Sequence, residues 1–298
     1  MKYGIRGICR KKAGKKHKSF RRIGGGYYAD VYKADYENES IIIKVHKSKG
    51  LTEREIEQIK LLSEYSLSPM PEILWVHSAD AEFDSDAFAM TLLEGMNGGT
   101  IYYLRKSKRE KLAEDVINNL LAFHNVKNPD GFGAIGGRRY ATFNEYYREK
   151  AYEIAGYAQK LYEKGQLPEV VLSVVKKAVE GFDKVFCLPI TDASLIHGDY
   201  NMWNILVDRK NCLVSAVIDP CGCMWADSEY DLYQLNNANG RHLKLFERYR
   251  KKKVLSENYI QKMAFYELFT EIEHYYNSGY PVNKKRLQKC ADKLEKYL

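Results

Sequence analysis

The sequence of 298 residues has no long apolar run. No stretch approaches the roughly 18 uninterrupted apolar residues that suggest a membrane-spanning helix. The basic N-terminus also lacks the apolar core of a secretory signal. We therefore expect a cytoplasmic protein without a membrane partner. Internal repeats and low-complexity linkers are absent as well, which argues against a repeat architecture.

Cysteine is scarce, because six residues in so long a chain make a poor disulfide framework. Cys221 and Cys223 form a C-x-C pair that could be half of a metal site. No second pair or histidine cluster has a matching spacing, and thiolate sites normally need four soft ligands. The favoured interpretation is reduced cysteines packed near a loop, with a metal–thiolate site as the alternative.

Positive charge is concentrated at one end of the chain. The formal net charge is +8, and residues 1–22 hold ten of the 47 Lys and Arg residues and no acid. The other residues carry 37 bases against 39 acids, so the rest of the chain is nearly neutral. A basic arm from Lys2 to Arg22 could bind nucleic acid or an anionic surface. A solvated terminus without a partner is the favoured alternative, so a nucleic-acid partner is unlikely.

The first third of the chain is rich in strand patterns and contains one helical pattern. The helix is expected over 52–65, where Thr52 and Glu55 have the spacing of a capping box. The strands have β-branched and aromatic residues bounded by turn residues. They are expected at 27–34, 41–46, 73–77 and 88–93.

Beyond residue 95 the patterns are mainly helical. Helices are expected at 110–125, 142–164, 168–186, 231–249 and 256–276. Two short strands are expected at 203–208 and 212–218. A sheet-rich part followed by a helical part predicts an α+β fold with two lobes. We expect a basic arm at 1–22, an N-lobe at 23–95 and a C-lobe at 96–298.

A glycine turn precedes the first predicted strand. Residues Gly24 to Ala29 match G-x-G-x-x-A, but a strand follows rather than the helix of a dinucleotide-binding fold. A glycine turn between antiparallel strands, with Gly24 and Gly26 free of a Cβ, lets backbone N–H groups approach nucleotide phosphates. A plain hairpin turn is the alternative. A second match, at 131–136, follows a helix and is interpreted as a loop between two helices.

Lys44 lies among β-branched residues of a predicted strand. A charge on a half-buried strand needs a partner, and Glu55 on the next helix could supply one, with Glu53 and Glu57 as rivals. The functional interpretation is a lysine held by Glu55 and directed at nucleotide phosphates. A solvated lysine on an edge strand is the alternative.

The segment LIHGDYNMWNILVD contains the pattern H-x-D-x-x-x-x-N. Asp199 and Asn204 are followed, fifteen residues later, by Asp219 at the end of an apolar strand. Phosphoryl transfer needs a carboxylate that accepts the hydroxyl proton, metal ligands such as an amide and a second carboxylate, and a cation on the phosphates. Asp199, Asn204, Asp219 and Lys44 supply these groups in the expected chain order. A polar turn with a strand-end aspartate is the alternative.

From about Ile23 to His274 the chain resembles a family of small-molecule kinases. This family includes aminoglycoside phosphotransferases, choline kinases and fructosamine kinase-like proteins. The most specific segments are LIHGDYNMWNILVD and AVIDPCGCMWADSEYDLYQL. The resemblance implies a protein-kinase-like fold, with a small antiparallel-sheet N-lobe that carries one helix and a larger, mainly helical C-lobe. It also implies ATP and Mg²⁺ as cofactors.

The resemblance further implies roles for individual residues. Asp199 would be the catalytic base, with Asn204 and Asp219 as the Mg²⁺ ligands. Lys44 would contact the phosphates, braced by Glu55. The segment Met90 to Gly95 would be the hinge that meets adenine, which includes Leu92 and Glu94. Asp231 would support the catalytic loop.

Two departures from the protein-kinase pattern narrow the predicted class of kinase. Gly198 replaces the arginine of H-R-D, and only eleven residues separate Asp219 from Asp231, which leaves little room for a peptide-docking loop. A small-molecule kinase is therefore favoured over a protein kinase. The segment CGCMW is unusual among the small-molecule relatives. A nucleotide-binding module with weak or no catalysis is therefore the alternative function.

The acceptor is expected to be a small molecule with a hydroxyl group. The helices at 138–186 and near the C-terminus should wall its pocket. Glu267 and Glu271 lie one helical turn apart, and Asp227 and Glu229 lie near Asp219. Such carboxylates would suit a cationic acceptor, such as an amino sugar, an aminoglycoside, a fructosamine-like amine or choline. A solvated helix face is the alternative.

Overall fold

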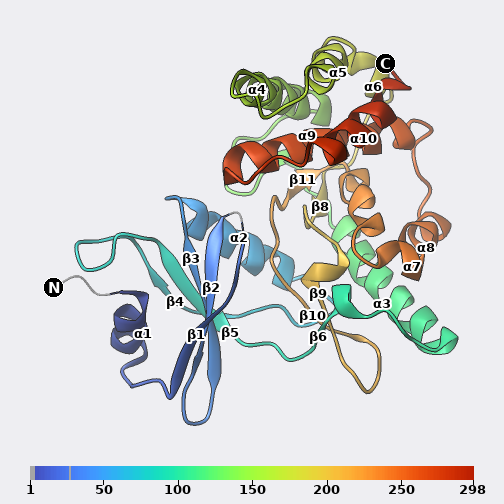
Figure 1. The fold of residues 1–298 in the computed structure, drawn as a ribbon. Coiled ribbons are helices and arrows are strands. Elements are labelled where there is room, and N and C mark those ends of the chain that lie inside the picture. Colours follow the sequence, from blue (N-terminus) through green and yellow to red (C-terminus); the bar gives the residue numbers. More distant parts are fainter. Residues whose placement is uncertain (1–3, 27) are drawn as a thin grey trace.

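The computed structural model describes residues 4–26 and 28–298. They form two lobes, a sheet-based N-lobe and a larger helical C-lobe (Figure 1). This α+β arrangement agrees with the fold class predicted from the sequence. The β5–β6 connection, residues 92–95, is the covalent link between the two lobes, close to the expected boundary.

The N-lobe contains a five-stranded antiparallel sheet in the order β1-β2-β3-β5-β4. Each predicted strand of this lobe is present within a few residues of its expected bounds, although Tyr27 in the first of them lies outside the described residues. The elements are α1 (Ile5–Ala13), β1 (Ser19–Gly25), β2 (Ala29–Asp35), β3 (Ser40–His46), α2 (Leu51–Ser63), β4 (Ile73–His77) and β5 (Ala87–Thr91).

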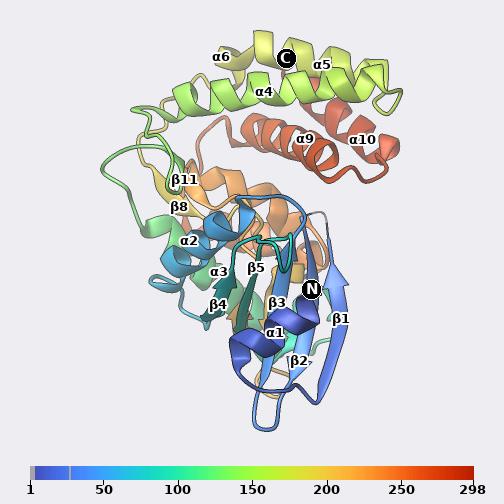
Figure 2. The ribbon, with the colours of Figure 1, turned by 90° about the vertical axis from the view of Figure 1, so that its left-hand side faces the viewer.

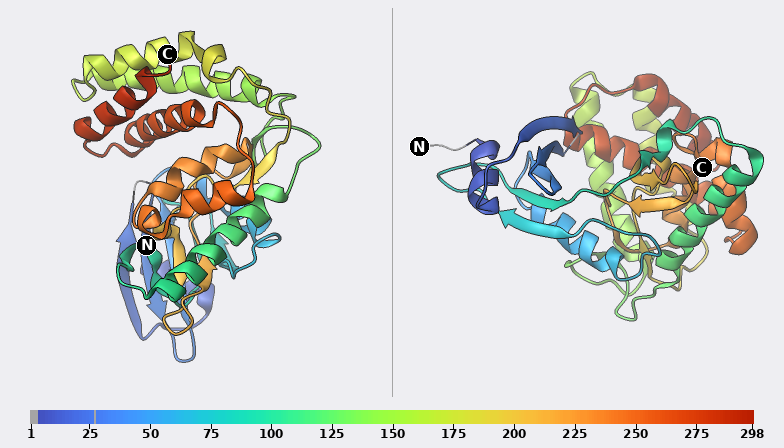
Figure 3. Two further views of the ribbon diagram at one scale, coloured as in Figure 1. Left: turned by 90° about the vertical axis from the view of Figure 1, so that its right-hand side faces the viewer. Right: turned by 90° about the horizontal axis from the view of Figure 1, so that it is seen from below.

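A helix packs on each face of this sheet, because apolar side chains alternate between the two faces of β3 and β5. Ile43 and Ala89 pack toward Cys9 of α1, and Phe88 packs toward Ile56 and Ile59 of α2. Helix α1 lies on the outer side of the sheet, away from the C-lobe (Figures 1 and 3). The N-lobe therefore carries a second helix that the sequence analysis did not predict.

The interpretation of residues 4–22 as a solvated arm is wrong. Ile8 and Cys9 are buried against the sheet, and the Cys9 Sγ lies 3.0 Å from the Tyr36 hydroxyl. Residues 19–25 form the first strand of the sheet. The basic side chains obscured the amphipathic pattern of α1, whose apolar side consists of Ile5, Ile8, Cys9 and Ala13. Lys2 lies outside the described residues.

The C-lobe is built on one continuous apolar core. Helices α4, α5, α9 and α10 pack against one another as a layer at the end of the lobe distant from the sheet (Figure 2). Its longer helices are α3 (Lys106–Asn125), α4 (Phe143–Glu163), α5 (Glu169–Glu180), α8 (Leu245–Lys252), α9 (Tyr259–Ser278) and α10 (Lys284–Glu295).

Short elements of the C-lobe position the loops that face the N-lobe. The two short strands expected at 203–208 and 212–218 are present as β9 and β10, which pair antiparallel with Val217 opposite Ile205. The short elements are β6 (Met96–Asn97), η1 (Gly98–Thr100), β7 (Gly133–Ala134), α6 (Phe182–Val185), β8 (Ser194–Ile196), η2 (Met202–Asn204), β9 (Ile205–Val207), β10 (Val214–Val217), β11 (Met224–Ala226), η3 (Ser228–Asn236) and α7 (Gly240–Leu243).

Three local predictions are wrong. The helix expected over 231–249 is divided into η3, α7 and α8, with Lys244 in the left-handed region at φ 54°. The helix expected over 168–186 is interrupted at Gly181. Thr52 and Glu55 do not form a capping box, because the Thr52 hydroxyl bonds to His46 and the Glu55 carboxylate bonds to His46 and Lys44.

Within residues 4–26 and 28–298, no helix combines the length and the apolar character needed to cross a membrane.

Candidate active site

Lys44 joins the two lobes at the centre of the cleft between them. Its Nζ lies 2.7 Å from Glu55 Oε1 on α2 and 2.5 Å from Asp219 Oδ1 of the C-lobe. Burial disfavours the ammonium, but the Asp219 and Glu55 carboxylates raise the pKa of Lys44 above its ordinary value. The lysine is therefore held as a cation in a fixed position. Of the three acids considered for this contact, Glu55 is the partner in the structure.

Asp219 follows β10 and adopts φ 58°, a left-handed conformation that is uncommon outside glycine. Its side chain is 49% exposed, so one carboxylate oxygen bonds Lys44 while the group still faces the cleft. The Lys44 ammonium holds the pKa of Asp219 below its ordinary value. Asp219 is thus kept ionised beside the lysine.

Asp199 and Asn204 lie together on the loop before β9. The Asn204 Nδ2 donates to Asp199 Oδ2 at 2.8 Å, and the Asn201 Nδ2 donates to Asp199 Oδ1 at 2.7 Å. Burial and the nearby Asp219 raise the pKa of Asp199 to about 7. The β9–β10 pairing brings Asp219 to this loop, since the Ile218 N–H donates to the Asn204 carbonyl at 3.0 Å.

Asp231 supports the backbone of the loop that carries Asp199. It is fully buried and accepts hydrogen bonds from the backbone N–H groups of His197 and Gly198, at 2.9 and 2.8 Å. The Nε2 of His124 lies 3.2 Å from the same carboxylate. These contacts fix the backbone on the N-terminal side of Asp199, so the geometry agrees with the supporting position expected for Asp231.

Gly198 makes room for the CGCMW segment. Its φ is 83°, and a Cβ at this position would lie 2.5 Å from the Cys221 carbonyl oxygen and 2.5 Å from the Gly222 carbonyl carbon. Both of these atoms belong to the backbone, so neither can move aside as the end of a flexible side chain could. The glycine that replaces the arginine of H-R-D is therefore required by close backbone packing.

We expect Gly198→Ala to lower the free energy of unfolding by about 2 kcal/mol, because a left-handed conformation is combined with a steric clash. Urea denaturation measures the change. Gly156→Ala in α4 is the matched control, since its new methyl group meets nothing within 4 Å. The control should be stabilised by roughly 0.5–1 kcal/mol. Equal stability of the two variants would contradict the packing argument.

The charged groups border a cleft of about 380 Å³. Lys44, Glu55, Asp199 and Asp219 line it, and Asn204 adjoins it through Asp199. As expected, the helices of the C-lobe wall its other end, with Tyr146 and Lys150 of α4, Tyr230 and Gln234 of η3, and Thr270, Glu273, His274 and Asn277 of α9. The sequence analysis named none of these eight positions as a site residue, and the pattern of a half-buried helix offers no signal that could separate them from packing residues.

The glycine turn and the hinge lie outside the residues that line this cleft. Gly24 pairs with Val31, and the Gly26 N–H donates to the Ala29 carbonyl at 2.9 Å, so the turn is a tight hairpin. A Cβ would be crowded at Gly25, while Gly24 and Gly26 have open space around them. This open space leaves the turn accessible to a ligand.

The segment from Leu92 to Gly95 runs between the lobes and is anchored to β10. The Ser215 hydroxyl donates to the Glu94 carbonyl at 2.8 Å. Gly95 is at φ 152°, and a Cβ there would clash with the Ser215 hydroxyl and lie 2.8 Å from the Leu206 Cβ. Contact of the Leu92 and Glu94 backbone with adenine stays a prediction.

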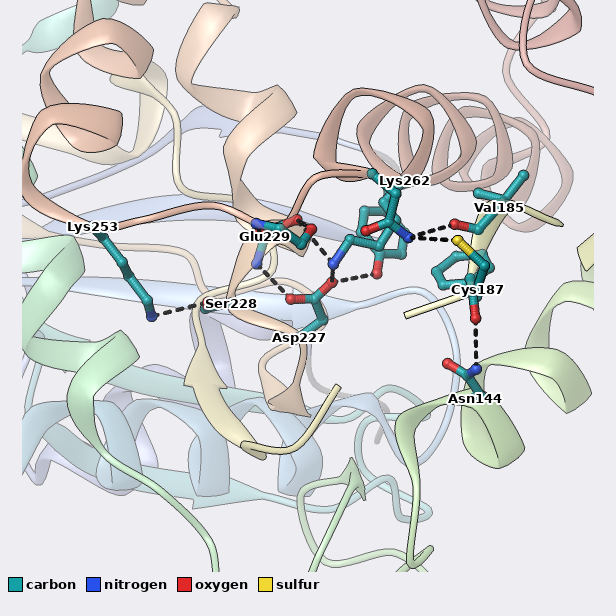
Figure 4. Close-up of polar contacts among 12 residues, drawn as sticks. Asn144, Val185, Cys187, Asp227, Ser228, Glu229, Lys253 and Lys262 are labelled. Atoms are coloured by element: carbon teal, nitrogen blue, oxygen red, sulfur yellow. Dashed lines mark hydrogen bonds and ion pairs between the residues drawn. The ribbon is translucent and has the colours of Figure 1, made fainter. Parts of the chain in front are cut away.

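Asp227 and Glu229 are buried away from the cleft. Figure 4 shows Lys262 between them, with its Nζ 2.7 Å from Asp227 Oδ2 and 2.9 Å from Glu229 Oε2. The Tyr266 hydroxyl also donates to Asp227, at 2.8 Å. These two acids therefore stabilise the C-lobe, and the expectation that they face the acceptor is wrong.

Glu267 and Glu271 face α10. Lys293 lies 2.8 Å from Glu267 and Arg286 lies 2.7 Å from Glu271. Neither glutamate lines the cleft. The expectation that this pair recognises a cationic acceptor is therefore also wrong, because both carboxylates hold two helices together.

None of the six cysteines forms a disulfide in the structure. Cys221 lines the cleft, and burial and the Asp199 and Asp219 carboxylates raise its pKa to about 12. Cys223 is fully buried. In the part of the chain that the structure describes, no group of three or more His, Cys, Asp or Glu side chains is arranged to hold a metal ion.

Solved structures share this fold over nearly the whole chain. A crystal structure of a fructosamine-3-kinase candidate from Haemophilus somnus 129PT has a TM-score of 0.73 at 15% identity, over 97% of this chain and 96% of the other. The aminoglycoside phosphotransferase APH(4)-Ia with ADP and hygromycin B has a TM-score of 0.71 at 16% identity, over 99% and 98%. A gentamicin complex of APH(2")-IIa has a TM-score of 0.70 at 15% identity, over 100% and 97%.

The fold is thus that of the protein-kinase-like small-molecule phosphotransferases. The sequence model of the phosphotransferase enzyme family matches residues 19–252, and the chain belongs to this family. The family and fold predicted from the sequence are confirmed. The uncharacterised protein YcbJ of Escherichia coli (strain K12) is 24% identical over 197 residues, and the match spans 63% of this chain and 63% of YcbJ.

Proposed function

We propose that this phosphotransferase uses ATP and Mg²⁺ and moves the γ-phosphate to a hydroxyl group of a small molecule. The observation that carries the proposal is the position of Lys44, bonded to Glu55 of one lobe and Asp219 of the other. This contact holds a cation in the cleft that Asp199 also lines. Phosphoryl transfer depends mainly on such positioning and on electrostatic stabilisation of the phosphates.

Each group of the site has a place in this reaction. Asp199 is half-buried and held by two amide donors, so it can accept the proton of an acceptor hydroxyl. Lys44 neutralises phosphate charge while Glu55 fixes its orientation. The hairpin with Gly24 and Gly26 lies over the phosphates, where the lack of a Cβ at both glycines leaves space for them. The backbone of Leu92 and Glu94 reads the adenine.

The donor atoms fit Mg²⁺, which prefers oxygen ligands. The Asn204 Nδ2 is already used in hydrogen bonds to the Asp199 carbonyl and carboxylate, which leaves the amide oxygen as the free donor atom. Asp219 contributes a half-exposed carboxylate. Asn204 and Asp219 would therefore hold the ion. When bound, it supplies charge neutralisation of the phosphate oxygens.

The acceptor class predicted from the sequence was an amino sugar, an aminoglycoside or a fructosamine-like amine. Complexes with hygromycin B and gentamicin among the similar structures support that class by analogy. The four carboxylates on which the prediction rested are occupied by Lys262, Lys293 and Arg286. The hydroxyl group is therefore the feature of the acceptor that this proposal retains.

Thermal unfolding with ATP, with and without Mg²⁺, tests the nucleotide site. At 100 times its Kd, a ligand of the folded state stabilises it by about 2.7 kcal/mol. We expect wild type to be stabilised and Asp219→Ala to lose the Mg²⁺-dependent part of this stabilisation. The exposed Asp192 provides a matched control, because Asp192→Ala leaves the cleft intact. No stabilisation of wild type would mean that the segment 195–219 is only a polar turn.

A nucleotide-binding module with little catalysis remains the second candidate. The specific observation is that the CGCMW segment packs directly against Gly198 of the catalytic loop. Stabilisation by ATP and Mg²⁺ without any ATP turnover, unchanged in Asp199→Asn, would favour this function over the kinase.

A further inference from the structure

The cleft has an acceptor end that is distinct from its nucleotide and metal groups. We define this acceptor end by Tyr146 and Lys150 of α4 together with Thr270, Glu273 and Asn277 of α9. All five line the same cleft as Asp199. Helices α4 and α9 pack side by side, so these residues form one wall (Figure 2).

The charges of this wall balance each other. The Lys150 Nζ lies 3.0 Å from Glu273 Oε1, and the two side chains are only 18% and 26% exposed. Burial opposes the ammonium, but the Glu273 carboxylate raises the pKa of Lys150 above its ordinary value. Burial lowers the pKa of the neighbouring His274, which favours its neutral form.

Few other charges reach the cleft. Apart from Lys44, Glu55, Asp199 and Asp219, the charged side chains among the described lining residues are those of Arg54, Lys150 and Glu273. Arg54 is exposed on α2, where solvent weakens its field. No carboxylate of the acceptor end is thus left to neutralise an ammonium group on the acceptor.

The rest of the wall is suited to hydroxyl groups. Tyr28, which follows the glycine turn, reaches α9, where its ring lies 5.6 Å from the ring of His274. The Tyr230 hydroxyl lies 2.9 Å from that of Thr270. Aromatic faces with nearby hydroxyl and amide groups provide stacking surfaces and hydrogen bonds without net charge.

We propose that the acceptor is an uncharged polyhydroxylated compound of the sugar or polyol class, bound against the Lys150–Glu273 pair. The proposal rests on the proposed function. A cationic acceptor would lose hydration in a half-buried wall whose single carboxylate is already paired. A neutral compound uses the same pair as a donor and an acceptor of hydrogen bonds.

The test uses three compounds of one shape: glucose, glucosamine and glucuronate. Their binding is measured by thermal shift and by calorimetry, with the nonhydrolysable nucleotide AMP-PNP and Mg²⁺ present. We expect wild type to bind glucose at least about tenfold more tightly than either charged compound. In Lys150→Met, Glu273 loses its cationic partner. The affinity for glucosamine relative to the affinity for glucose should then rise by at least about tenfold.

Two further variants keep the test interpretable. The double variant Lys150→Met with Glu273→Gln has no charge on the wall, so it should prefer glucose again. Lys164→Met, at the exposed end of the same helix, should behave as wild type. A wild-type preference for glucosamine or glucuronate, equal binding, no binding of any of the three, or an unchanged order in Lys150→Met would each overturn the proposal. Stabilisation by AMP-PNP and Mg²⁺ alone reports separately on the proposed function.

Discussion

Asp199→Asn is expected to lower the rate of Mg²⁺-dependent ATP turnover by about 10²–10⁴-fold, the usual contribution of a positioned general base. The amide has the same shape but cannot accept the hydroxyl proton. Binding of ATP with Mg²⁺ should stay within about threefold of wild type, because Lys44, Glu55 and Asp219 are unchanged. Steady-state turnover and calorimetric titration measure the two effects.

The surface variant Asp192→Asn is the control for this substitution. It removes one carboxylate from an exposed position, where it lies 3.6 Å from the Lys127 ammonium. Its turnover should match wild type. If Asp199→Asn kept full turnover, Asp199 would not be the base, and the kinase mechanism proposed for this site would have to be abandoned.

Lys262→Met is expected to destabilise the C-lobe by about 3–5 kcal/mol, the range for removing one partner of a buried ion pair. Lys262 is only 2% exposed, and its ammonium contacts both Asp227 and Glu229. Without it, two buried carboxylates lie next to each other with no cation between them. Equilibrium denaturation in urea measures the loss.

Lys293→Met is the control for Lys262→Met, because it removes an ion-paired lysine from an exposed position instead of a buried one. Lys293 is 45% exposed and bonds Glu267 at the surface, so its removal should cost no more than about 1 kcal/mol. A similar small cost for Lys262→Met would show that the network around Asp227 and Glu229 does not hold the C-lobe together.

The sequence predicted the central groups of the site because their chemistry is local. Asp199 and Asn204 lie five residues apart on one loop, and strand pairing of the adjoining segments brings Asp219 to it. Lys44 and Glu55 are separated by one short turn between a strand and a helix. Periodicity and short spacing are sufficient to place such groups together.

The direction of acidic side chains could not be predicted. Glu267 and Glu271 share one face of α9, but only the tertiary structure shows that α10 covers this face. Lys262 lies 35 residues after Asp227 and 33 residues after Glu229, and no local pattern indicates that pairing. Helix α1 was missed for a related reason, since its few buried residues lie among many basic ones.

The side chains of helix α9 have two separate roles. Glu267 and Glu271 fasten it to α10, while Thr270, Glu273 and Asn277 project into the cleft at intervals of three and four residues. On the proposal that the acceptor binds against this stripe, substitutions of Thr270 or Asn277 would alter which compounds are accepted and would leave the ion pairs between α9 and α10, and between α9 and α4, in place. Within a lineage, substrate range can change through a few substitutions on one helix while the scaffold stays constant.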